Sequence, residues 1–235
     1  MPTSLPSDAP VLVLASPGGA TGVAEEIAAV VRVDNPQIEV LLTGVDDLAD
    51  SLPSGREAVV VPLLTWDDPV VLAEIGKAVA ASGSGAVVTE ALGPHPLLAE
   101  VLHIRLAERG LARADRVRLL NVSSPVDAVI LATAGGERAV HAVQATAVLL
   151  ASRLTLPVVA ASLDSEPGVA MAAERLRAAG AERLAVSPCL IGYEAPADVV
   201  EQAAASINAG HAEPLGSHSA LAELVARAYG SQLAS

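Results

Sequence analysis

The sequence predicts an α/β protein of two duplicated lobes, each built on a mainly parallel four-stranded sheet flanked by helices. The first observation is an internal repeat: the ten residues from Leu92 to Val101 return from Leu215 to Leu224, and six of the ten positions are identical. The second is that short apolar runs alternate with helix-like stretches along the chain, which is typical of parallel strands joined by helical crossovers. The third is the length of 235 residues, which divides into two halves of ordinary domain size.

Two further pairs of segments support the repeat. Each half contains one apolar strand followed by two glycines, and each half contains one strand that ends in Pro. These pairs are 11–14 with 129–131, and 61–64 with 187–190. We therefore predict an N-terminal lobe over residues 10–112 and a C-terminal lobe over residues 113–235, with residues 1–9 as a flexible N-terminus because they are rich in Pro, Ser and Asp.

In the first lobe, residues 10–15 form an apolar, β-branched run closed by Pro17-Gly18-Gly19, the pattern of a strand buried on both faces. Asp67 and Asp68 before Pro69 mark a helix start, and Gly110 marks a helix end. The predicted strands are 10–15, 38–42, 58–64 and 86–89, and the predicted helices are 20–33, 45–52 (a short helix or turn), 69–81 and 96–109.

The second lobe repeats the order of strand and helix, with Gly180 and Gly210 marking helix ends. Its predicted strands are 128–132, 157–161 and 184–188, and its predicted helices are 137–153, 167–179, 197–208 and 219–229. The arginine-rich segment 109–124 is expected to carry the crossing between the lobes. Ligands of parallel sheets bind beyond the carboxyl ends of the strands, so we expect a shared cleft there.

Composition excludes several classes of function. A net charge of −13 repels nucleic acid and anionic membranes alike, and no apolar run reaches the roughly 18 residues of a membrane helix. The residues at the N-terminus lack the features of a signal peptide, so we expect a cytoplasmic protein. Cys189 is the only cysteine, which rules out an intrachain disulfide. A homodimer is compatible with so apolar a chain.

The repeated Leu-Gly-x-His-x-x-Leu-Ala-Glu segments, together with Val-Val-Val-Pro-Leu-Leu at 59–64 and the segment 175–186, resemble the sirohydrochlorin chelatase family. These are small metal-inserting enzymes of cobalamin and sirohaem biosynthesis. The resemblance extends from Pro10 to Gly230. It implies a chelatase-like fold of two lobes and a lyase that inserts Co²⁺ or Fe²⁺, as substrate, into a tetrapyrrole, with no permanently bound cofactor.

The family pattern also implies a histidine after the first strand, a glutamate at the end of the second and a histidine after the third. Here Ser16 and Thr43 stand at the first two positions, Thr65 and Trp66 occupy a shortened loop at the third, and Thr133 matches Ser16 in the second lobe. A hydroxyl does not replace imidazole as a ligand for a divalent metal at neutral pH. No metal ligand and no catalytic residue is therefore assigned.

Gly18-Gly19 and Gly135-Gly136 each follow a buried strand and precede a helix. Their backbone amides could receive a carboxylate of a tetrapyrrole at a helix N-terminus, although turns of this kind also require glycine for their backbone angles. The candidate ligand-binding residues are Ser16, Gly18, Gly19, Thr43, Thr65, Trp66, Thr133, Gly135 and Gly136.

His95 and His218 are paired by the repeat and precede predicted helices. They could be metal ligands, but a helix-capping role is the stronger interpretation. The acids Asp67, Asp68, Asp164, Glu166 and Glu194 could supply metal-binding oxygens, although acids at helix starts usually serve the cap and the helix dipole. Cys189 is expected to be a small core residue.

Two functions remain open. The chain is either a sirohydrochlorin-type chelatase whose metal ligands have moved to acids, or a non-catalytic paralogue that binds a tetrapyrrole or its metal complex or acts as a regulatory or structural subunit. Whether it is an enzyme depends on which of these holds.

Overall fold

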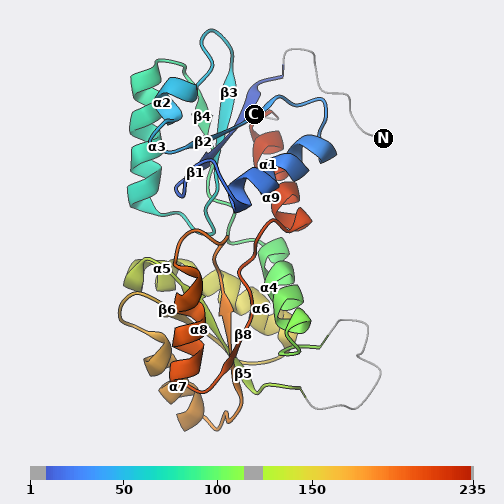
Figure 1. Cartoon of the computed structure of the whole chain (residues 1–235), viewed down its shortest axis with the longest axis vertical. Coiled ribbons are helices and arrows are strands. Elements are labelled where there is room, and N and C mark those ends of the chain that lie inside the picture. Colours follow the sequence, from blue (N-terminus) through green and yellow to red (C-terminus); the bar gives the residue numbers. More distant parts are fainter. Residues whose placement is uncertain (1–8, 114–123, 234–235) are drawn as a thin grey trace. The chain divides into compact units, whose positions relative to one another are not determined.

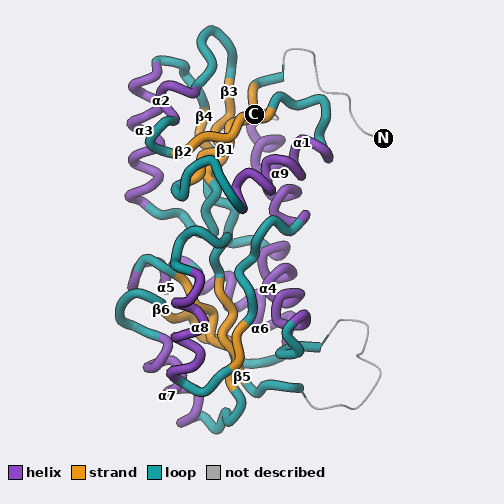
Figure 2. Tube along the Cα trace, viewed as in Figure 1, coloured by secondary structure: helices purple, strands orange, loops and turns teal. Residues whose placement is uncertain are grey.

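The computed structural model describes residues 9–113 and 124–233. It contains two four-stranded sheets, all of whose strand pairs are parallel, with helices on both faces of each (Figures 1 and 2). This arrangement confirms the predicted α/β class of two sheets. Of the predicted flexible segment 1–9, residues 1–8 lie outside the described residues, and so do residues 114–123 of the predicted crossing segment.

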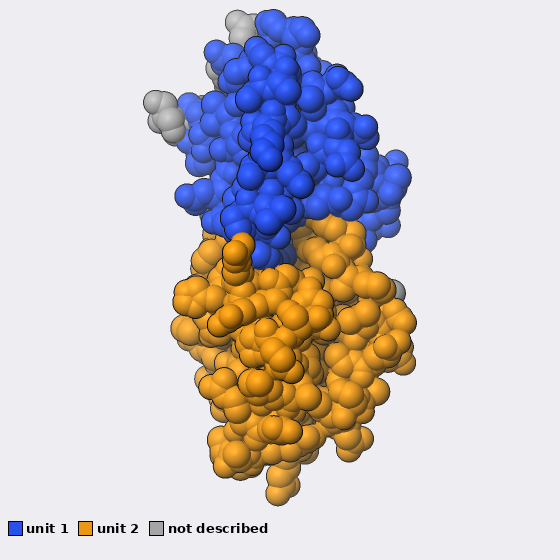
Figure 3. Space-filling model, turned by 90° about the vertical axis from the view of Figure 1, so that its left-hand side faces the viewer, with its two compact units in different colours: residues 1–92, 217–235 blue, residues 93–216 orange. Residues whose placement is uncertain are grey.

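The chain divides into two compact units, shown in different colours in Figure 3. Unit 1 consists of Met1–Leu92 and Ser217–Ser235, and unit 2 of Gly93–Gly216. These units differ from the lobes predicted over 10–112 and 113–235, because each sheet is completed by the closing helix of the other half of the sequence. Helix α4 (Pro96–Glu108) follows the first sheet but packs in unit 2, and α9 (Ser219–Leu233) follows the second sheet but packs in unit 1.

Unit 1 has the strand order β2-β1-β3-β4. Its strands are β1 (Val11–Ser16), β2 (Val40–Gly44), β3 (Ala58–Pro62) and β4 (Val87–Val88), and its helices besides α9 are α1 (Val23–Asp34), α2 (Leu48–Ser51) and α3 (Pro69–Ser82). One face of the sheet packs against α2 and α3 through a cluster that contains Val13, Val60, Leu48 and Ile75. The α1 and α9 helices pack against each other and against β2 and β3 (Figure 1).

The last helix is attached to the first strand. Tyr229 in α9 is fully buried, and its hydroxyl donates a 2.7 Å hydrogen bond to the carbonyl of Pro10, immediately before β1. Leu221 and Val225 on the same helix are also fully buried. Burying large apolar side chains contributes about 1.5–3 kcal/mol each, so α9 is an integral part of the core of unit 1.

Unit 2 repeats the topology with the order β6-β5-β7-β8. Its strands are β5 (Ala128–Thr133), β6 (Val158–Ser162), β7 (Leu184–Pro188) and β8 (Gly210–His211), and its helices besides α4 are α5 (Gly136–Ala142), α6 (Gln144–Leu154), α7 (Val169–Ala178) and α8 (Ala197–Ser206). The α7 and α8 helices cover the face that carries Ile130 and Val186, and α4 and α6 pack against each other and against β7 and β6.

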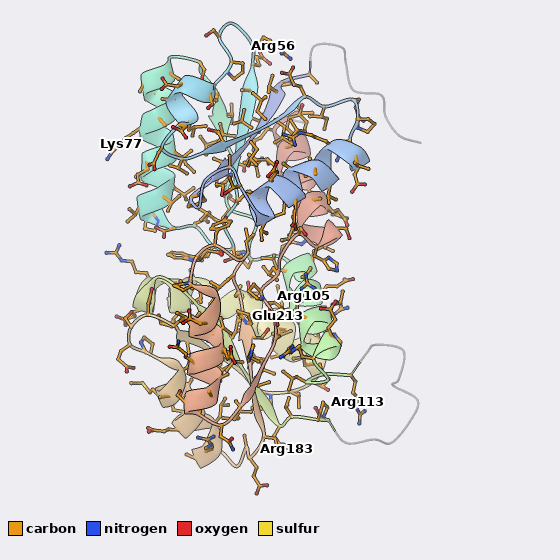
Figure 4. All side chains as sticks on the ribbon, viewed as in Figure 1. Arg56, Lys77, Arg105, Arg113, Arg183 and Glu213 are labelled. Atoms are coloured by element: carbon orange, nitrogen blue, oxygen red, sulfur yellow. The ribbon has the colours of Figure 1, made fainter. Side chains whose placement is uncertain are left out.

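Two arginines, Arg105 and Arg183, form hydrogen bonds near the two ends of unit 2 (Figure 4). The guanidinium of Arg105 on α4 donates from Nε and Nη2 to the carbonyl of Leu215, at 3.2 and 2.8 Å. At the start of β5, Asp127 accepts hydrogen bonds from the side chain and the backbone of Arg183, which hold the pKa of this carboxyl at about 2. These contacts fix the chain where it enters and leaves the second sheet.

The repeated Leu-Gly-x-His segment has the same structural role in both halves. The amide of Leu92 donates to the carbonyl of Leu64, and the amide of Leu215 donates to the carbonyl of Leu190. His95 accepts from the amide of Leu97 at its Nδ1, and His218 accepts in the same way from the amide of Ala220. The capping interpretation of the two histidines is therefore confirmed.

Three details differ from the sequence prediction. A short strand, β8, completes the second sheet, and the predicted helix 137–153 is two helices that meet at Val143. The helix predicted to end at 229 continues to Leu233. None of the helices in the described ranges is both long enough and apolar enough to cross a membrane.

Candidate functional site

Each sheet has a switch point where the strand order changes direction, between β1 and β3 in unit 1 and between β5 and β7 in unit 2. Doubly wound sheets bind ligands beyond the carboxyl ends of the strands at this point. The predicted residues Ser16, Thr65 and Trp66 follow β1 and β3, and Thr133 ends β5. The topology therefore brings these predicted residues to the edge of each sheet where a ligand is expected.

In unit 1, the turn from Pro17 to Gly22 connects β1 to α1. The carbonyl of Ser16 accepts hydrogen bonds from the amides of Gly19 and Val45, each at 3.2 Å, so it ties this turn to the end of β2. Gly18 is exposed and Gly19 is half-buried with φ at +86°. No side chain caps α1, which begins after Gly22. The turn thus presents backbone to solvent at a helix N-terminus, where an anion is favoured.

Ser16 and Thr43 do not form a common site. The register places Thr43 opposite Ala15 and Gly44 opposite Ser16, so the two hydroxyls project from opposite faces of the sheet. Thr43 is buried; its Oγ1 donates to the carbonyl of Gly44 and is 3.0 Å from Oγ of Ser51. The fully buried Oγ of Ser16 has no hydrogen-bond partner among the described residues. Thr43 is therefore structural, whereas Ser16 remains a polar group without a structural bond.

Beyond β3, the amide of Leu63 donates to the carbonyl of Ala15, which holds the two strand ends of the switch point together. Thr65 is buried at 3% exposure and Trp66 is half-buried. The next two acids are engaged by backbone amides. Asp67 accepts from Ala91, and Asp68 caps α3 by accepting from Val70 and Val71.

The matching turn in unit 2 is closed by an acid of the chain itself. The carboxylate of Asp164 accepts from the amide of Gly135 at 2.9 Å and from the amide of Gly136 at 3.2 Å. The hydroxyls of Ser162 and Ser165 donate to the same carboxylate at 2.5 and 3.2 Å. The predicted glycines Gly135 and Gly136 therefore bind a carboxylate, but that carboxylate belongs to the protein.

These bonds determine the charge state of Asp164. Burial raises the pKa of its carboxyl, but the hydrogen bonds from Ser162, Gly135, Ser165 and Gly136 together outweigh burial and bring the pKa below 3.8. Asp164 is thus an anion at neutral pH. Thr133, the last residue of β5, is buried, and its hydroxyl lies 3.4 Å from the carbonyl of Ala134.

The loop after β7 is held by a second carboxylate. Glu194 accepts from the amides of Ile191, Gly192 and Tyr193 at 2.7, 2.8 and 3.1 Å. Burial nevertheless raises the pKa of Glu194 above 4.5, against the lowering effect of the backbone amides. Cys189, at the same end of β7, is fully buried in the core, as expected.

The donor set does not favour a metal centre built from acids. Asp67, Asp68, Asp164, Glu166 and Glu194 all accept hydrogen bonds from backbone amides. Among residues 9–113 and 124–233, no three or more His, Cys, Asp or Glu side chains form a group that could hold a metal ion. The amide bonds fit the interpretation of these acids as supports of caps and turns.

The solved structure of CbiX, the terminal enzyme for biosynthesis of siroheme in denitrifying bacteria, has the same fold. It matches with a TM-score of 0.66 and 17% sequence identity, over 94% of this chain and 98% of that chain. No protein-family model matches the sequence. No curated protein matches it either. The likeness identifies the fold, two parallel α/β sheets of the chelatase type, which the sequence resemblance had predicted.

One residue that shapes the site was missed from the sequence. Ser162 was not singled out, and Asp164 was considered as a metal ligand or as an acid that serves a cap, but not as the partner of Ser162 in closing the turn before α5. The strand register of the structure aligns Ser16 with Gly44 and Thr133 with Ser162, so the two halves can be compared position by position at these strand ends. Aligning the two halves through these pairs places Gly44 opposite Ser162 and Asp46 opposite Asp164.

Proposed function

We propose that the protein binds a carboxylated tetrapyrrole of the sirohydrochlorin type, and that the turn from Pro17 to Gly22 receives one of the ring's acidic side chains. The observation that carries this proposal is the carboxylate of Asp164 on the amides of Gly135 and Gly136. It is an intramolecular example of a carboxylate bound at the same turn of the repeat.

In unit 1 no described carboxylate accepts a hydrogen bond from the amides of the corresponding turn, although Oδ2 of Asp47 lies 3.7 Å from the position that a Cβ of residue 44 would take. Gly44 stands where unit 2 has Ser162, so no hydroxyl is available to hold Asp46 in the position of Asp164. The Gly19 amide turns back to Ser16 instead, and α1 has no side-chain cap. An acetate or propionate group of a tetrapyrrole could supply the missing acceptor, since the amides of a helix N-terminus favour negative charge.

Metal insertion is the second candidate, and the full-length likeness to CbiX supports it. In that case Co²⁺ or Fe²⁺ would be a substrate rather than a resident cofactor. Insertion requires a group that accepts the pyrrole protons. Asp67, Asp68, Asp164, Glu166 and Glu194 are bonded to backbone amides, and Ser16 and Thr43 are poor bases. Binding without catalysis, as a carrier or a subunit, therefore agrees better with the side chains.

The experiment is a titration of purified protein with sirohydrochlorin, followed by the absorption spectrum of the ring and by the melting temperature of the protein. Binding raises the melting temperature because the ligand stabilises only the folded state. Addition of Co²⁺ to the bound ring then separates the two candidates. An insertion rate equal to the spontaneous rate supports a binding protein, and an accelerated rate supports a chelatase. If neither ring nor metal changes the melting temperature, both candidates fail.

A single substitution tests where the ring binds. Gly44→Ser introduces the hydroxyl that unit 2 has, and a Cβ at this position would lie 3.4 Å from Cα of Gly19 and 3.7 Å from Oδ2 of Asp47, both ordinary contacts. We expect the new hydroxyl to hold a carboxylate, that of Asp46 or of the adjacent Asp47, over the turn and to weaken ring binding at least tenfold. The control is Gly44→Ala, which adds the Cβ without the hydroxyl. Equal binding by both variants and the wild type would remove the turn from the proposed site.

A further inference from the structure

The outer edge of β6 lies beside a groove in unit 2. The sheet order makes β6 an edge strand, and Figure 1 shows it next to α5 and α7. The groove has a volume of about 190 Å³, and its lining includes Val158, Val159 and Ala160 of the strand and Met171 and Arg175 of α7. Because three consecutive strand residues line it, the groove follows the edge of the sheet, where backbone groups lie, and not only one face.

The hydrogen bonds show which backbone groups point outward. The carbonyl of Pro157 accepts from Val129 and the amide of Leu163 donates to Thr133, so the odd-numbered residues of this segment bond to β5. The amide of Ser162 points away from β5 and donates to the carbonyl of Pro167. By alternation, the amides and carbonyls of Val158 and Ala160 also point outward, and no described residue bonds to them across this edge.

The equivalent edge in unit 1 is protected. The register pairs Leu12 with Val40 and Val129 with Val158, so Val40 is the counterpart of Val158. Arg32 in the last turn of α1 donates from Nε and Nη2 to the carbonyl of Val40, at 3.2 and 3.1 Å. In unit 2, Arg153 in the last turn of α6 bonds instead to Nδ1 of His103. Within residues 9–113 and 124–233, no arginine therefore bonds to the outward carbonyls of β6.

Charges beside the edge favour an antiparallel neighbour. Gly168, at the start of α7, pairs with Ser162 at the carboxyl end of β6, and α7 runs back from there, so Arg175 lies toward the amino end of the strand. Arg175 is exposed and forms no salt bridge with another described residue. Asp164 and Glu166, both exposed, lie in the loop at the carboxyl end. An antiparallel copy would bring each Arg175 to the acidic loop of the other.

We propose that a second copy of this chain pairs with β6 edge to edge, in an antiparallel homodimer. Val158 lies opposite the partner's Ala160, and Val159 lies on the twofold axis, because the outward residues of an antiparallel pair exchange both of their backbone hydrogen bonds. Two such pairs give four intermolecular backbone hydrogen bonds. Met171, 42% exposed, covers the junction. The strand itself, Val-Val-Ala-Ala-Ser, has no charge to prevent self-pairing.

The test is the oligomeric state of the full chain, measured by sedimentation over a series of concentrations. The wild type is expected to show a concentration-dependent dimer, because the paired segment is short. Ala160→Pro removes an outward amide but no bond to β5, and proline is tolerated on edge strands. We expect this variant to be a folded monomer. Its control is Leu42→Pro, at the equivalent outward position of the guarded β2, which should remain dimeric.

Charge reversal separates pairing from folding. Arg175→Glu should weaken the dimer at least tenfold, and adding Glu166→Arg in the same chain should restore it, because opposite charges again meet across the edge. Circular dichroism confirms that each variant is folded. The proposal is overturned if the wild type is a monomer up to its solubility limit, if folded Ala160→Pro still dimerises, or if the double variant remains as weak as Arg175→Glu.

Discussion

Unit 1 and unit 2 share strand order and register but satisfy equivalent polar groups with different residues. After β5, Asp164 holds the glycine amides of the turn, whereas after β1 the amide of Gly19 bonds to the carbonyl of Ser16 at the end of its own strand. At the sheet edge the difference is reversed, because Arg32 bonds to the edge of β2, whereas no arginine among the described residues bonds to the edge of β6. The two units thus share the course of the backbone but differ in side-chain contacts. The turn after β1 has no carboxylate bonded to its amides, and the outer edge of β6 has no side chain bonded to its carbonyls, among the described residues.

The largest expected effect on stability comes from removing Asp164, whose carboxylate accepts from the amides of the turn after β5. Asp164→Ala leaves two backbone amides and two hydroxyls without their acceptor, and we expect a loss of about 2–3 kcal/mol in the free energy of unfolding. The control, Asp46→Ala at the equivalent exposed position of unit 1, should change stability by less than about 0.5 kcal/mol. Urea unfolding measures both. Equal losses would show that the two turns are not organised differently.

The loop after β7 offers a second test, through pH. Glu194→Gln places an amide nitrogen against backbone amides and should cost about 1–2 kcal/mol near pH 4.5, with a smaller difference from the wild type at pH 7. In the wild type the folded-state pKa of Glu194 is raised above 4.5, so its contribution to stability declines as pH rises from 4.5 through that pKa. The variant should lack this decline. A variant whose pH profile matches the wild type above pH 4.5 would contradict the assignment.

Asp164 should have the opposite pH dependence. Its folded-state pKa lies below 3.8, so its stabilising contribution is fully present above 3.8 and is lost as pH falls through the folded value. Asp164→Ala should therefore differ most from the wild type above pH 4 and progressively less in acid. Thermal unfolding of the two proteins between pH 2 and pH 7 measures this difference. A constant difference over the whole range would refute the expected charge of Asp164.

A smaller, stabilising effect is expected when Gly44→Ser gives the turn after β1 the hydroxyl that the turn after β5 has. Gly44→Ser allows Asp46 to bond as Asp164 does, and it reduces the freedom of the unfolded chain, so we expect a gain of about 0.5–1 kcal/mol. The part of the gain that comes from the new bond should be lost when Asp46→Ala is added, and only the smaller part that comes from the unfolded chain should remain. Chemical unfolding of the single and double variants measures the coupling between the two positions. A gain that persists in the double variant would come from the backbone alone.

The smallest effect should come from buried hydroxyls that have no hydrogen-bond partner among the residues that the structure describes. Ser16→Ala and Ser187→Ala each remove a fully buried Oγ without a partner, and we expect changes within about 0.5 kcal/mol or slight stabilisation. Their melting temperatures measure this. A marked loss in either variant would reveal a bond made by that hydroxyl in solution.

The sequence predicted most of the fold because the central strands are uniformly apolar and several helices begin or end at Pro, Asp or Gly. It did not predict β8, whose Gly210 and His211 carry no strand pattern, or the break at Val143, where neither Pro nor Gly interrupts the helix. It also assigned α4 and α9 to the wrong sheets, since the apolar face of a helix does not specify which of two similar sheets it covers.

At the site, the histidine caps follow from local spacing. The bond between Asp164 and Gly135 joins residues far apart in the sequence and could not be read locally.

The exchange of α4 and α9 sets the order in which the molecule can be finished during synthesis. Gly93–Gly216 is one continuous segment, so every described element of that half is available before α9 has been made. The other half needs α9, which is translated after that whole segment, and Tyr229 reaches its acceptor at Pro10 only then. A chain that ended before α9 would contain all described elements of unit 2, but the core of unit 1 would remain exposed to water on the face that α9 covers.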